Sequence, residues 1–464
     1  MNDKKNRKSP LDTFLQLFAD VRPGEGFGVV VMTLTILMLM FSYYIIKTVR
    51  EPLILDVEGG AELKSYSSGL QAIALVFALP VYNWLAATVN TKRLLFYVVG
   101  FFLLCIQGFF FALQASLPVG VIFFVWVGIF SLSTIGLFWS FANEVYTREA
   151  GERLFPVIGI GMTGGAFAGS FLAKELFGDD VSPAVVLQVA AGLLVAHGAL
   201  YAFSLSRKEV RDALSPGSDE HAEEAADDAA AAEKPKGFRA AVEGFALVFD
   251  RPYLRLIALL ILLLNLVNTT GEYILSSYVV DLANEAVANG EANSVGAFLG
   301  EFYGDFFFWV NVAGVTLQAF VASRIVKYLG IGGVIFALPM VSGAAYAMAS
   351  FGVAFSVFRW AKTSENATDY SVMNTARAML WLPTSREEKY VAKQTVDTFV
   401  VRLGDLLSAG LVFAGTTWFG LSPQGFALTN VALVVVWIGL GWLLYRSYQR
   451  LAEGKRDPAS PATF

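Results

Sequence analysis

The chain has 464 residues, of which 56% are hydrophobic and 16% charged, and its formal net charge is −5. This balance is typical of a membrane protein, and it argues against nucleic-acid binding because no basic stripe exists to neutralise phosphates. A single cysteine, Cys105, and two histidines exclude a disulfide framework and disfavour a transition-metal site, so no cofactor is predicted.

Residues 1–26 are predicted to form a cytoplasmic N-terminus with a short amphipathic helix on the membrane surface. Apolar side chains recur at helical spacing between Leu11 and Val21, before a break at Pro23. The next apolar run begins near Phe27, is long enough to span a bilayer and lacks a small-residue cleavage site behind it. It is therefore expected to be retained as the first membrane helix.

Apolar runs near the roughly 20 residues that a bilayer requires predict an all-α polytopic membrane protein with twelve transmembrane helices. Two six-helix halves, 27–205 and 251–447, flank a cytoplasmic linker, and a cytoplasmic tail, 448–464, ends the chain. The linker, 206–250, begins with the basic residues Arg207, Lys208 and Arg211. An Ala-, Asp- and Glu-rich run from Asp219 to Glu233, which contains His221, predicts disorder, and the linker ends in an amphipathic helix. The predicted spans are 27–47, 65–88, 93–115, 118–146, 151–176, 182–205, 251–280, 295–323, 326–350, 352–380, 392–418 and 425–447.

The two halves carry short strings at matching positions. Phe18-Ala-Asp-Val-Arg-Pro23, before the first span, is echoed by Phe249-Asp-Arg-Pro252 before the seventh. Thr147-Arg148-Glu149, after the fourth span, is echoed by Ser385-Arg386-Glu387 after the tenth. Matching positions favour an internal duplication, with chance similarity of such short strings as the alternative.

The basic residues of the short loops predict the orientation. Lys and Arg occupy alternate loops, which places both termini and the linker in the cytoplasm. The spans are expected to lie in a bacterial inner membrane. Lys64 and Lys174 break the pattern, but both lie near span ends, where snorkelling of a long side chain toward the interface explains them. Lys47 and Arg50 also break it and need another explanation.

Candidate binding residues of the first half lie at the ends of two spans. Lys47 and Arg50 are one helical turn apart and form a candidate anion site, although Arg50 paired with Glu51 is an equal alternative. Asn143 and Glu144 bring an amide and a carboxylate to the end of the fourth span. Glu144 is a candidate gate or solute contact, or else an ordinary interfacial acid.

Two features of the first half are predicted to serve helix packing. Gly159-Ile-Gly-Met-Thr-Gly164 fits a dinucleotide-binding fingerprint, which we reject because that motif needs a preceding strand in a soluble βαβ unit. Gly161, Gly165 and Gly169 instead recur every four residues, the pattern that lets membrane helices approach closely. His197 lies in an apolar run, where a packing role is favoured over a proton relay.

The most polar span lies in the second half. Arg359, Lys362, Glu365 and Asp369 follow one another at spacings of three, three and four, so they share one face of a helix, and Arg377 follows eight residues later. Charges at membrane depth are costly and are functional by default. The face is therefore expected to line a cavity, with a surface helix between spans as the alternative.

Further polar residues interrupt the seventh, eighth and eleventh spans. Asn268 and Glu272 lie in a row of leucines and are candidate cavity residues. Asp305 precedes an aromatic run in the eighth span. In the eleventh, Arg402 is expected either to pair with Asp397 or Asp405, or to contact the solute.

Several of these strings resemble the ATP/ADP translocase family, the nucleotide transporters of plastids and intracellular bacteria. The resemblance rests on Asp369-Tyr-Ser371 with Arg377-Ala-Met-Leu-Trp-Leu-Pro383, on Lys393-Gln-Thr-Val-Asp397, and on Phe138-Trp-Ser-Phe-Ala-Asn143. Tyr44-Ile-Ile46 and Arg50 are similar to the place where the family keeps a cation, and Glu272 to the place of a carboxylate. The resemblance covers the membrane domain and implies the fold of the major facilitator superfamily.

The chain departs from the family pattern at four polar positions. It has Asp369 and Asp405 where the family has Lys, Asn374 where the family has Asp, and Ala378 where the family has an acid. An uncompensated negative charge near a phosphate costs a few kcal/mol in a low-dielectric cavity. The identity of the phosphorylated solute is therefore left open.

The residues and the resemblance together predict a secondary transporter, not an enzyme, that works by alternating access on a nucleotide or a related phosphorylated metabolite. Its partners are expected to be this solute and membrane lipids, with the protein a monomer. A proton-coupled carrier of a zwitterionic or cationic solute is the first alternative, motivated by Glu272, Asp305, Asp369 and Asp405. A non-transporting scaffold and a lipid scramblase are further alternatives.

Overall fold

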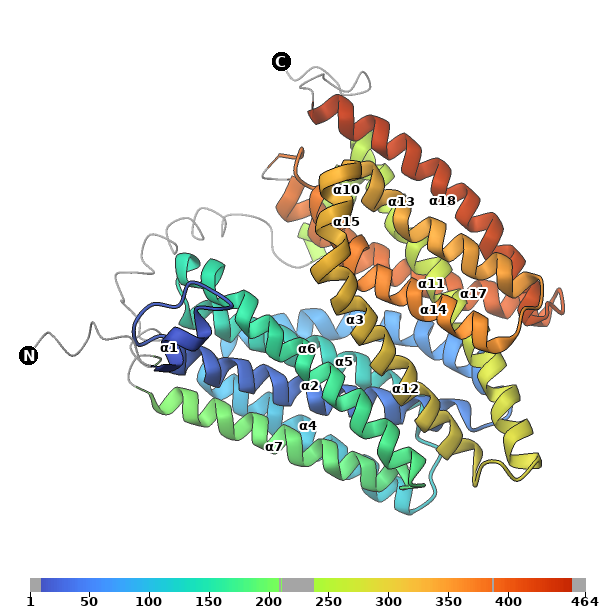
Figure 1. The fold of residues 1–464 in the computed structure, drawn as a ribbon, viewed down its shortest axis with the longest axis horizontal. Coiled ribbons are helices and arrows are strands. Elements are labelled where there is room, and N and C mark those ends of the chain that lie inside the picture. The colour runs from blue at the N-terminus through green and yellow to red at the C-terminus, as the bar shows by residue number, and fades with distance from the viewer. Residues whose placement is uncertain (1–9, 208–209, 211–237, 386–387, 453–464) are drawn as a thin grey trace, which may run out of the picture. The chain divides into compact units, whose positions relative to one another are not determined.

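The computed structural model describes residues 10–207, 210, 238–385 and 388–452. All regular elements in these ranges are helical (Figure 1), which confirms the predicted all-α class. Residues 208–209 and 211–237 of the predicted linker, with His221, and residues 453–464 of the predicted tail lie outside the described residues.

The helices follow one another along the chain with short connections. They are α1 (Pro10–Leu15), α2 (Gly26–Leu55), α3 (Gly60–Thr88), α4 (Thr91–Gln114), α5 (Gly120–Val145), α6 (Arg148–Gly178), α7 (Pro183–Ser206), α10 (Phe238–Asp250), α11 (Pro252–Ala288), α12 (Val295–Thr316), η1 (Leu317–Ala322), α13 (Ser323–Ser350), α14 (Phe355–Thr368), η2 (Asp369–Met373), α15 (Asn374–Leu380), η3 (Glu388–Ala392), α16 (Lys393–Thr395), η4 (Val396–Val400), α17 (Val401–Thr417) and α18 (Pro423–Ala452). The η segments are π turns, in which the hydrogen bonds run from i to i+5.

Ten helical segments of the described chain are long and apolar enough to cross a membrane, so this is a multi-pass membrane protein. One of them, 295–350, contains two of the predicted spans, and Gly330 leaves helical geometry inside it at φ 61° and ψ −154°. The predicted span 352–380 is helical as α14, η2 and α15 but is too polar to be counted by composition. The total of twelve spans therefore stays a prediction.

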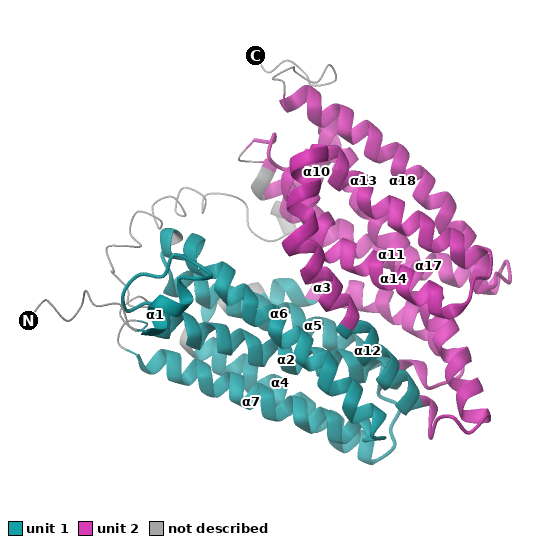
Figure 2. Ribbon diagram, viewed as in Figure 1, with its two compact units in different colours: residues 1–53, 78–233, 296–308 teal, residues 54–77, 234–295, 309–464 magenta. Residues whose placement is uncertain are grey.

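The chain divides into two compact units (Figure 2). Unit 1 comprises 1–53, 78–233 and 296–308, and unit 2 comprises 54–77, 234–295 and 309–464. Most of each predicted half falls in one unit. The second long helix of each half is divided, because α3 begins in unit 2 and the first part of α12 belongs to unit 1.

Close packing of α6 on α2 forms part of unit 1. A Cβ atom added at Gly161 or Gly165 would overlap the carbonyl oxygen of Thr33 or Leu37, and one added at Gly169 would lie 2.6 Å from that of Phe41. The three glycines therefore bring the two backbones together, as small residues do in membrane helices. The packing interpretation of this motif is confirmed.

His197 of α7 also serves packing in unit 1. Its imidazole is buried, and Nδ1 lies 2.8 Å from the carbonyl oxygen of Thr35 on α2. This contact satisfies one ring nitrogen away from water, which confirms the packing role.

The N-terminal segment packs on the same unit. The side chain of Asp12 is buried and accepts hydrogen bonds from the backbone N–H groups of Gly24 and Gly26, at 3.2 and 3.0 Å, next to the start of α2. Leu15 and Val21 join a buried cluster with Val29 and residues of α6. The predicted amphipathic helix is thus shorter than expected, since α1 ends at Leu15.

The repeated strings of the two halves make similar contacts. Arg22, before α2, forms an ion pair with Glu149 at the start of α6, and Arg251, before α11, lies 3.8 Å from Glu388, the residue that follows the repeated string 385–387. Thr147 and Ser385 each accept a hydrogen bond from the backbone N–H three residues later, at 3.4 and 3.2 Å. Such side-chain caps satisfy N–H groups that a helix start leaves unpaired. The matching caps are consistent with an internal duplication.

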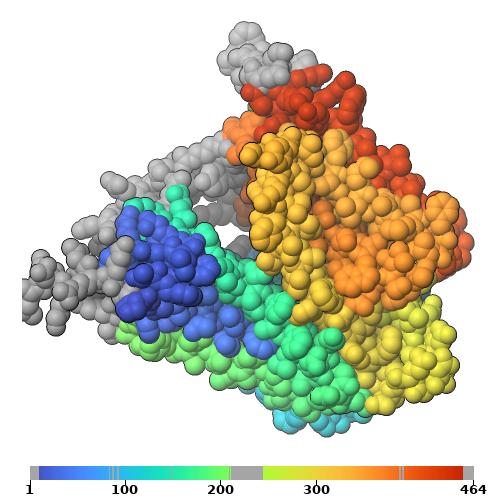
Figure 3. All heavy atoms as spheres, viewed as in Figure 1, coloured from blue at the N-terminus to red at the C-terminus, as the bar shows by residue number. Residues whose placement is uncertain are grey.

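Unit 2 carries an apolar surface where α12, η1 and α13 follow one another. In the space-filling view the gold residues of this stretch lie on the visible face (Figure 3). Within the sequence of this stretch Phe320, Tyr328 and Leu329 are exposed. Large exposed apolar side chains are expected where a membrane protein faces lipid tails.

Candidate functional site

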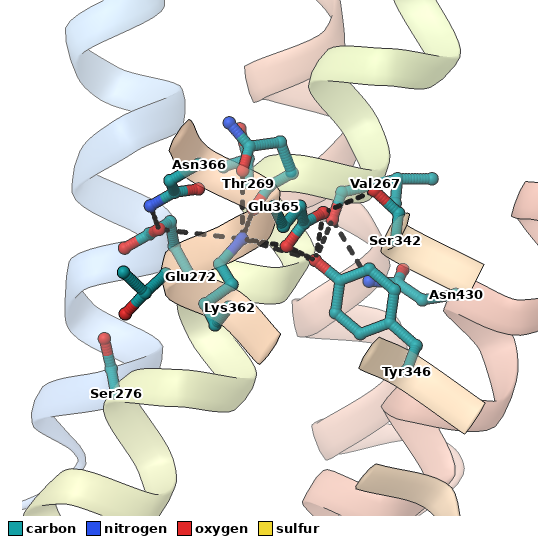
Figure 4. Close-up of polar contacts among 12 residues, drawn as sticks. Val267, Thr269, Glu272, Ser276, Ser342, Tyr346, Lys362, Glu365, Asn366 and Asn430 are labelled. Atoms are coloured by element: carbon teal, nitrogen blue, oxygen red, sulfur yellow. Dashed lines mark hydrogen bonds and ion pairs between the residues drawn. The ribbon is translucent and has the colours of Figure 1, made fainter. Parts of the chain in front are cut away.

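A network of polar side chains lies inside unit 2, where α11, α13 and α14 meet (Figure 4). Its centre is the charged face of α14 predicted from the sequence. The π turn η2 begins at Asp369, whose backbone N–H still bonds to the Glu365 carbonyl oxygen, so Asp369 continues the row of Arg359, Lys362 and Glu365 as predicted. The π turn shifts the helix after Asp369 and brings Arg377 to the face of Asp369.

Lys362 and Glu365 form the core of the network. Lys362 Nζ donates to Glu365 Oε2 at 2.8 Å and to Asn268 Oδ1 at 2.9 Å, and Lys362 is completely buried. The Glu365 carboxylate also accepts from the hydroxyls of Ser342, at 2.9 Å, and Tyr346, at 2.8 Å. A buried charge is tolerable when it is paired and hydrogen-bonded in this way.

Glu272 lies on the other side of Lys362, with its carboxylate beside α3 (Figure 4). Its Oε1 is 3.7 Å from Lys362 Nζ and accepts a hydrogen bond from Asn366 Nδ2 at 3.1 Å. Its Oε2 is 3.8 Å from Nζ of Lys64. The structure therefore brings Asn268, Glu272 and Lys362 together, as expected of residues that share a polar site.

The position of the Lys64 side chain differs from the one predicted. We expected its side chain to snorkel to the interface, but it is buried and donates a hydrogen bond to Ser276 Oγ at 3.0 Å. The reason is local, because α3 begins in unit 2 and carries Lys64 against polar positions of α11. A charged side chain with such partners has no need to reach the interface.

Gly271 makes room for the network. A Cβ atom at this position would overlap the Tyr346 hydroxyl and lie 2.9 Å from Lys362 Nζ. The bare backbone of α11 thus lets the tyrosine and the lysine approach each other, and Tyr346 Oη lies 3.3 Å from Lys362 Nζ. Any larger residue at position 271 displaces one of them.

Arg402 and Asp405 form a second polar group of unit 2. Arg402 Nη1 lies 3.2 Å from Asp405 Oδ2, and Asp405 Oδ1 accepts a hydrogen bond from Thr269 at 2.8 Å. Asp397 is exposed. The ion-pair alternative for Arg402 is therefore what the structure shows, with Asp405 as the partner.

Arg377 and Asp369 form a third group. Arg377 Nη2 lies 3.7 Å from Asp369 Oδ1, across the π turn, which brings residues eight apart back to one face. Asp369 Oδ1 and Arg377 Nε are buried and make no hydrogen bond within the described chain. Arg359 lies on the same helix farther from this pair, with its guanidinium 5.3 Å from the ring centre of Trp360.

The ion pairs with arginine alter the expected effect of Asp369 and Asp405, the two acids that depart from the family pattern, on an anionic solute. Asp369 and Asp405 each have an arginine within 4.0 Å in the same unit. A neutralised acid repels a phosphate far less than an isolated one, because the nearby cation offsets its field. The two acids therefore do not exclude an anionic solute.

The candidate cations of unit 1 lie on α2. Lys47 Nζ lies 4.1 Å from the ring centre of Phe307, and the Arg50 guanidinium lies 4.4 Å from that of Phe124. Arg50 also forms an ion pair with Glu51, whose side chain is buried. The pairing alternative for Arg50 is thus present, and an anion-binding role for either cation stays a prediction.

The other predicted residues of unit 1 lie apart from these cations. Asn143 and Glu144 are exposed at the end of α5. Lys174 of α6, expected to snorkel, is one-third exposed and pairs with Asp305 of α12 at 2.9 Å. Snorkelling alone is therefore the wrong explanation for Lys174 as well.

Sequence reasoning missed Lys64, Tyr346 and Gly271 as parts of the polar network. Only Lys64 carried a usable signal, since it was a cation outside the alternating loop pattern. Tyr346 lies in a run of small residues, and Gly271 resembles any helix glycine of a membrane span. Among the described residues no group of three or more His, Cys, Asp or Glu is placed to hold a metal ion.

Comparison with solved structures shows the fold. A nucleoside transporter, NupG, matches 90% of this chain and 99% of its own with a TM-score of 0.62 at 13% identity. A POT family transporter in complex with 5-aminolevulinic acid matches 92% of this chain and 96% of its own with a TM-score of 0.61 at 14% identity. These are major facilitator transporters, so the predicted fold is confirmed.

Comparison with known sequences shows the family. ADP,ATP carrier protein 1 of Chlamydia muridarum is 23% identical over 93% of this chain and 90% of its own length. ADP,ATP carrier protein 3 of Rickettsia felis is 21% identical over 82% of this chain and 85% of its own. The model of the TLC ATP/ADP transporter family matches residues 4–123 and 119–448, and the chain therefore belongs to this family of transporters.

Proposed function

We propose that the protein is a secondary carrier that exchanges nucleotides, of the ATP/ADP kind or as closely related phosphorylated metabolites, across the bacterial inner membrane by alternating access. The observation that carries the proposal is the end-to-end similarity to proteins named as ADP,ATP carriers, together with membership of their family. We also propose that it acts as a monomer with both termini in the cytoplasm.

One buried and two partly buried cations of unit 2 support an anionic solute. Lys362 is completely buried, and Arg377 and Arg402 are each less than one-third exposed. Cations at such depth are costly unless they serve a site. The residues proposed to contact the solute are those predicted from the sequence: Lys47, Arg50, Asn143, Glu144, Asn268, Glu272, Arg359, Lys362, Asp369, Arg377, Arg402 and Asp405.

Counterflow in liposomes tests the proposal. Purified protein is reconstituted into vesicles loaded with ATP, and labelled ADP is added outside. Uptake is expected only when the vesicles contain a nucleotide, since exchange needs a counter-substrate, and labelled adenosine is expected not to enter. A panel of ribonucleotides and deoxynucleotides, with folding checked by gel filtration, extends the test. Absence of uptake and exchange across the whole panel would reject the proposal.

A proton-coupled carrier of a zwitterionic or cationic solute is the second candidate. The observation that favours it is that Glu272, Asp305, Asp369 and Asp405 each have a cation partner within 4.0 Å. Protonation of such an acid would break its pair and bias a conformational change. In this case collapse of the proton gradient and the Glu272→Gln variant should each abolish accumulation of the solute, whereas nucleotide counterflow proceeds without a gradient.

A further inference from the structure

Asp369 and Arg377 of unit 2 form an ion pair whose charged groups are held apart. Arg377 Nη2 lies 3.7 Å from Asp369 Oδ1, whereas an arginine and a carboxylate in direct contact form hydrogen bonds of about 2.7–2.9 Å. Asp369 Oδ1 and Arg377 Nε are both buried, and neither makes a hydrogen bond within the part of the chain that the structure describes. The pair thus leaves one acceptor and one donor without a hydrogen-bond partner.

The two unsatisfied atoms indicate a place for a third polar group. Buried polar atoms of native proteins are nearly always hydrogen-bonded, because burial without a partner costs the free energy of their lost hydration. The side chains that carry these atoms are not fully enclosed, since that of Asp369 is 13% exposed and that of Arg377 is 27% exposed. A small polar group can therefore approach the pair and satisfy both atoms.

The pair is assembled by the π turn η2. In a regular helix, residues eight positions apart lie about 80° apart around the helix axis. η2 begins at Asp369 and ends at Met373, and the π turn brings Arg377 back to the face of Asp369. π turns interrupt the regular hydrogen bonding of a helix, and they occur frequently at functional sites. The backbone thus supports a functional role of this pair independently of the two unsatisfied atoms.

Other charges lie within electrostatic range of the pair, but none of them satisfies its two buried atoms. Lys362 and Glu365 act on Asp369, and they form an ion pair of their own at 2.8 Å. Asp397, which is exposed, lies within range of Arg377. The pair itself carries no net charge, because the carboxylate offsets the guanidinium. It is therefore suited to an uncharged group that carries a hydrogen-bond donor next to an acceptor.

The nucleoside part of a nucleotide offers such a group. A carboxylate accepts hydrogen bonds and a guanidinium donates them, so the group has to present a donor to Asp369 and an acceptor to Arg377. An ionised phosphate presents acceptors. The edge of adenine presents both in one plane, because its exocyclic amino group is flanked by ring nitrogens that accept. The ribose hydroxyls are the other source of a donor and an acceptor, and deoxy analogues distinguish them from the base.

We propose that Asp369 and Arg377 form a reader of the nucleobase, in which Asp369 accepts a hydrogen bond from the amino group of adenine and Arg377 donates one to a ring nitrogen beside it. This inference deepens the proposed function and rests on it, and it names adenine nucleotides as the substrates that the pair prefers. A nucleotide without the amino group leaves the Asp369 carboxylate unsatisfied. A site built for a hydrogen bond rejects such an analogue.

Displacement of radiolabelled ATP from the purified full chain in detergent tests the reader. The competitors are ATP, purine riboside triphosphate, which lacks only the amino group, and 2′-deoxy-ATP and 3′-deoxy-ATP, which each lack one ribose hydroxyl. The wild type is expected to bind purine riboside triphosphate about tenfold or more weakly than ATP, and the deoxy analogues within about threefold of ATP. The ratio of the dissociation constants is the measured quantity, so a general loss of affinity in a variant cancels.

Variants of the acid connect this ratio to Asp369. Asp369→Ala removes the acceptor and is expected to lower the ratio for purine riboside triphosphate to about twofold or less. Asp369→Ala combined with Arg377→Met leaves no unpaired charge, so it keeps the measurement possible if Asp369→Ala alone does not fold, and it should give the same low ratio. Asp397→Asn is the matched control, because it removes another carboxylate within electrostatic range of Arg377 and leaves Asp369 in place. Its ratio should equal that of the wild type.

Two deaza analogues test the donor. 1-Deaza-ATP and 7-deaza-ATP each lack one of the ring nitrogens that flank the amino group. One of them is expected to bind the wild type about tenfold or more weakly than ATP, and Arg377→Met is expected to remove this difference. Equal binding of ATP and both analogues to the wild type would overturn the role assigned to Arg377.

The outcomes separate the reader from the proposed function. If the wild type binds neither radiolabelled ATP nor radiolabelled ADP, the proposed exchange of these nucleotides fails and the reader fails with it. If the wild type binds ATP and purine riboside triphosphate equally, or if Asp369→Ala discriminates as the wild type does, the reader is wrong while the proposed function stands. The reader is also overturned if the deoxy analogues lose affinity and the purine analogue does not, because the pair then contacts the ribose.

Discussion

Lys362 Nζ lies 2.8 Å from Glu365 Oε2, one turn further along α14, and neither side chain is more than 3% exposed. The pair holds the centre of the polar network of unit 2. Because both charges are buried away from water, each is stabilised by its attraction to the other. Removal of one alone leaves an isolated buried charge.

The first prediction follows from this dependence. Lys362→Met is expected to destabilise the protein by about 3–5 kcal/mol, the cost of leaving a buried charge without its partner. Lys362→Met combined with Glu365→Gln should recover much of this loss, since no unpaired charge remains. Thermal unfolding of the single and double variants in detergent measures the coupling. Additive losses would show that the two charges do not interact as the geometry requires.

The second prediction concerns the space above Gly271. Gly271→Ala places a Cβ atom onto the Tyr346 hydroxyl and against Lys362 Nζ, so it is expected to lower stability by about 1–3 kcal/mol through overpacking. Gly410→Ala in α17 is the control, because a Cβ atom there meets nothing within 4 Å. The control should be neutral or slightly stabilising, since alanine favours a helix. Equal melting temperatures for the two variants would contradict the proposed crowding at Gly271.

The third prediction tests the contact between α6 and α2. Gly165→Val is expected to separate the helices and to reduce the yield of folded protein, because its Cβ atom would overlap the Leu37 carbonyl oxygen. Gly159→Val lies on the same helix with open space around it and serves as the control. Fluorescence-detected gel filtration of the two variants measures the difference. A folded Gly165→Val variant with the melting temperature of the control would contradict close packing at this position.

The sequence predicted the elements of this fold better than the contacts between them. Long apolar runs and the glycines spaced by four residues reveal helices and one packed face, because both signals are local. The partners of Lys64 and Lys174 come from distant helices, Glu272 on α11 and Asp305 on α12, so neither pair could be predicted from spacing along the chain. Snorkelling was the simplest explanation of both lysines from the sequence alone, but in the structure each lysine instead pairs with a carboxylate of another helix.

The charged face of α14 shows the same limit within one segment. A regular helix places Asp369 in line with Arg359, Lys362 and Glu365, and the sequence contains no signal for the π turn that begins there. Asp369 keeps its place in this row, and the turn brings Arg377 back toward it. Spacing therefore found the right residues for a polar site but not their division into separate pairs.

The last prediction concerns acid stability at the N-terminal end of unit 1, where Glu25 meets Arg153. The Glu25 carboxylate accepts hydrogen bonds of 2.9 and 3.0 Å from the Arg153 guanidinium and one of 2.8 Å from the Arg22 backbone N–H. Burial raises the pKa of Glu25, but these hydrogen bonds and the charges of both arginines outweigh it, so the pKa lies below its ordinary value of 4.5. The folded state therefore favours the ionised acid.

A lowered carboxyl pKa stabilises the fold above the unfolded pKa, near 4.5, and this contribution is lost as the pH falls through the folded pKa. Glu25→Gln is therefore expected to melt below the wild type at pH 7, by a difference worth about 1–2 kcal/mol for a charged hydrogen bond. The difference should shrink as the pH is lowered past 4.5, because the wild type then loses the same interaction. Glu285→Gln, at an exposed position, should melt like the wild type throughout. A Glu25→Gln difference that stays constant from pH 7 to the acid limit would show that packing at Glu25, and not its ionisation, stabilises this end of the bundle.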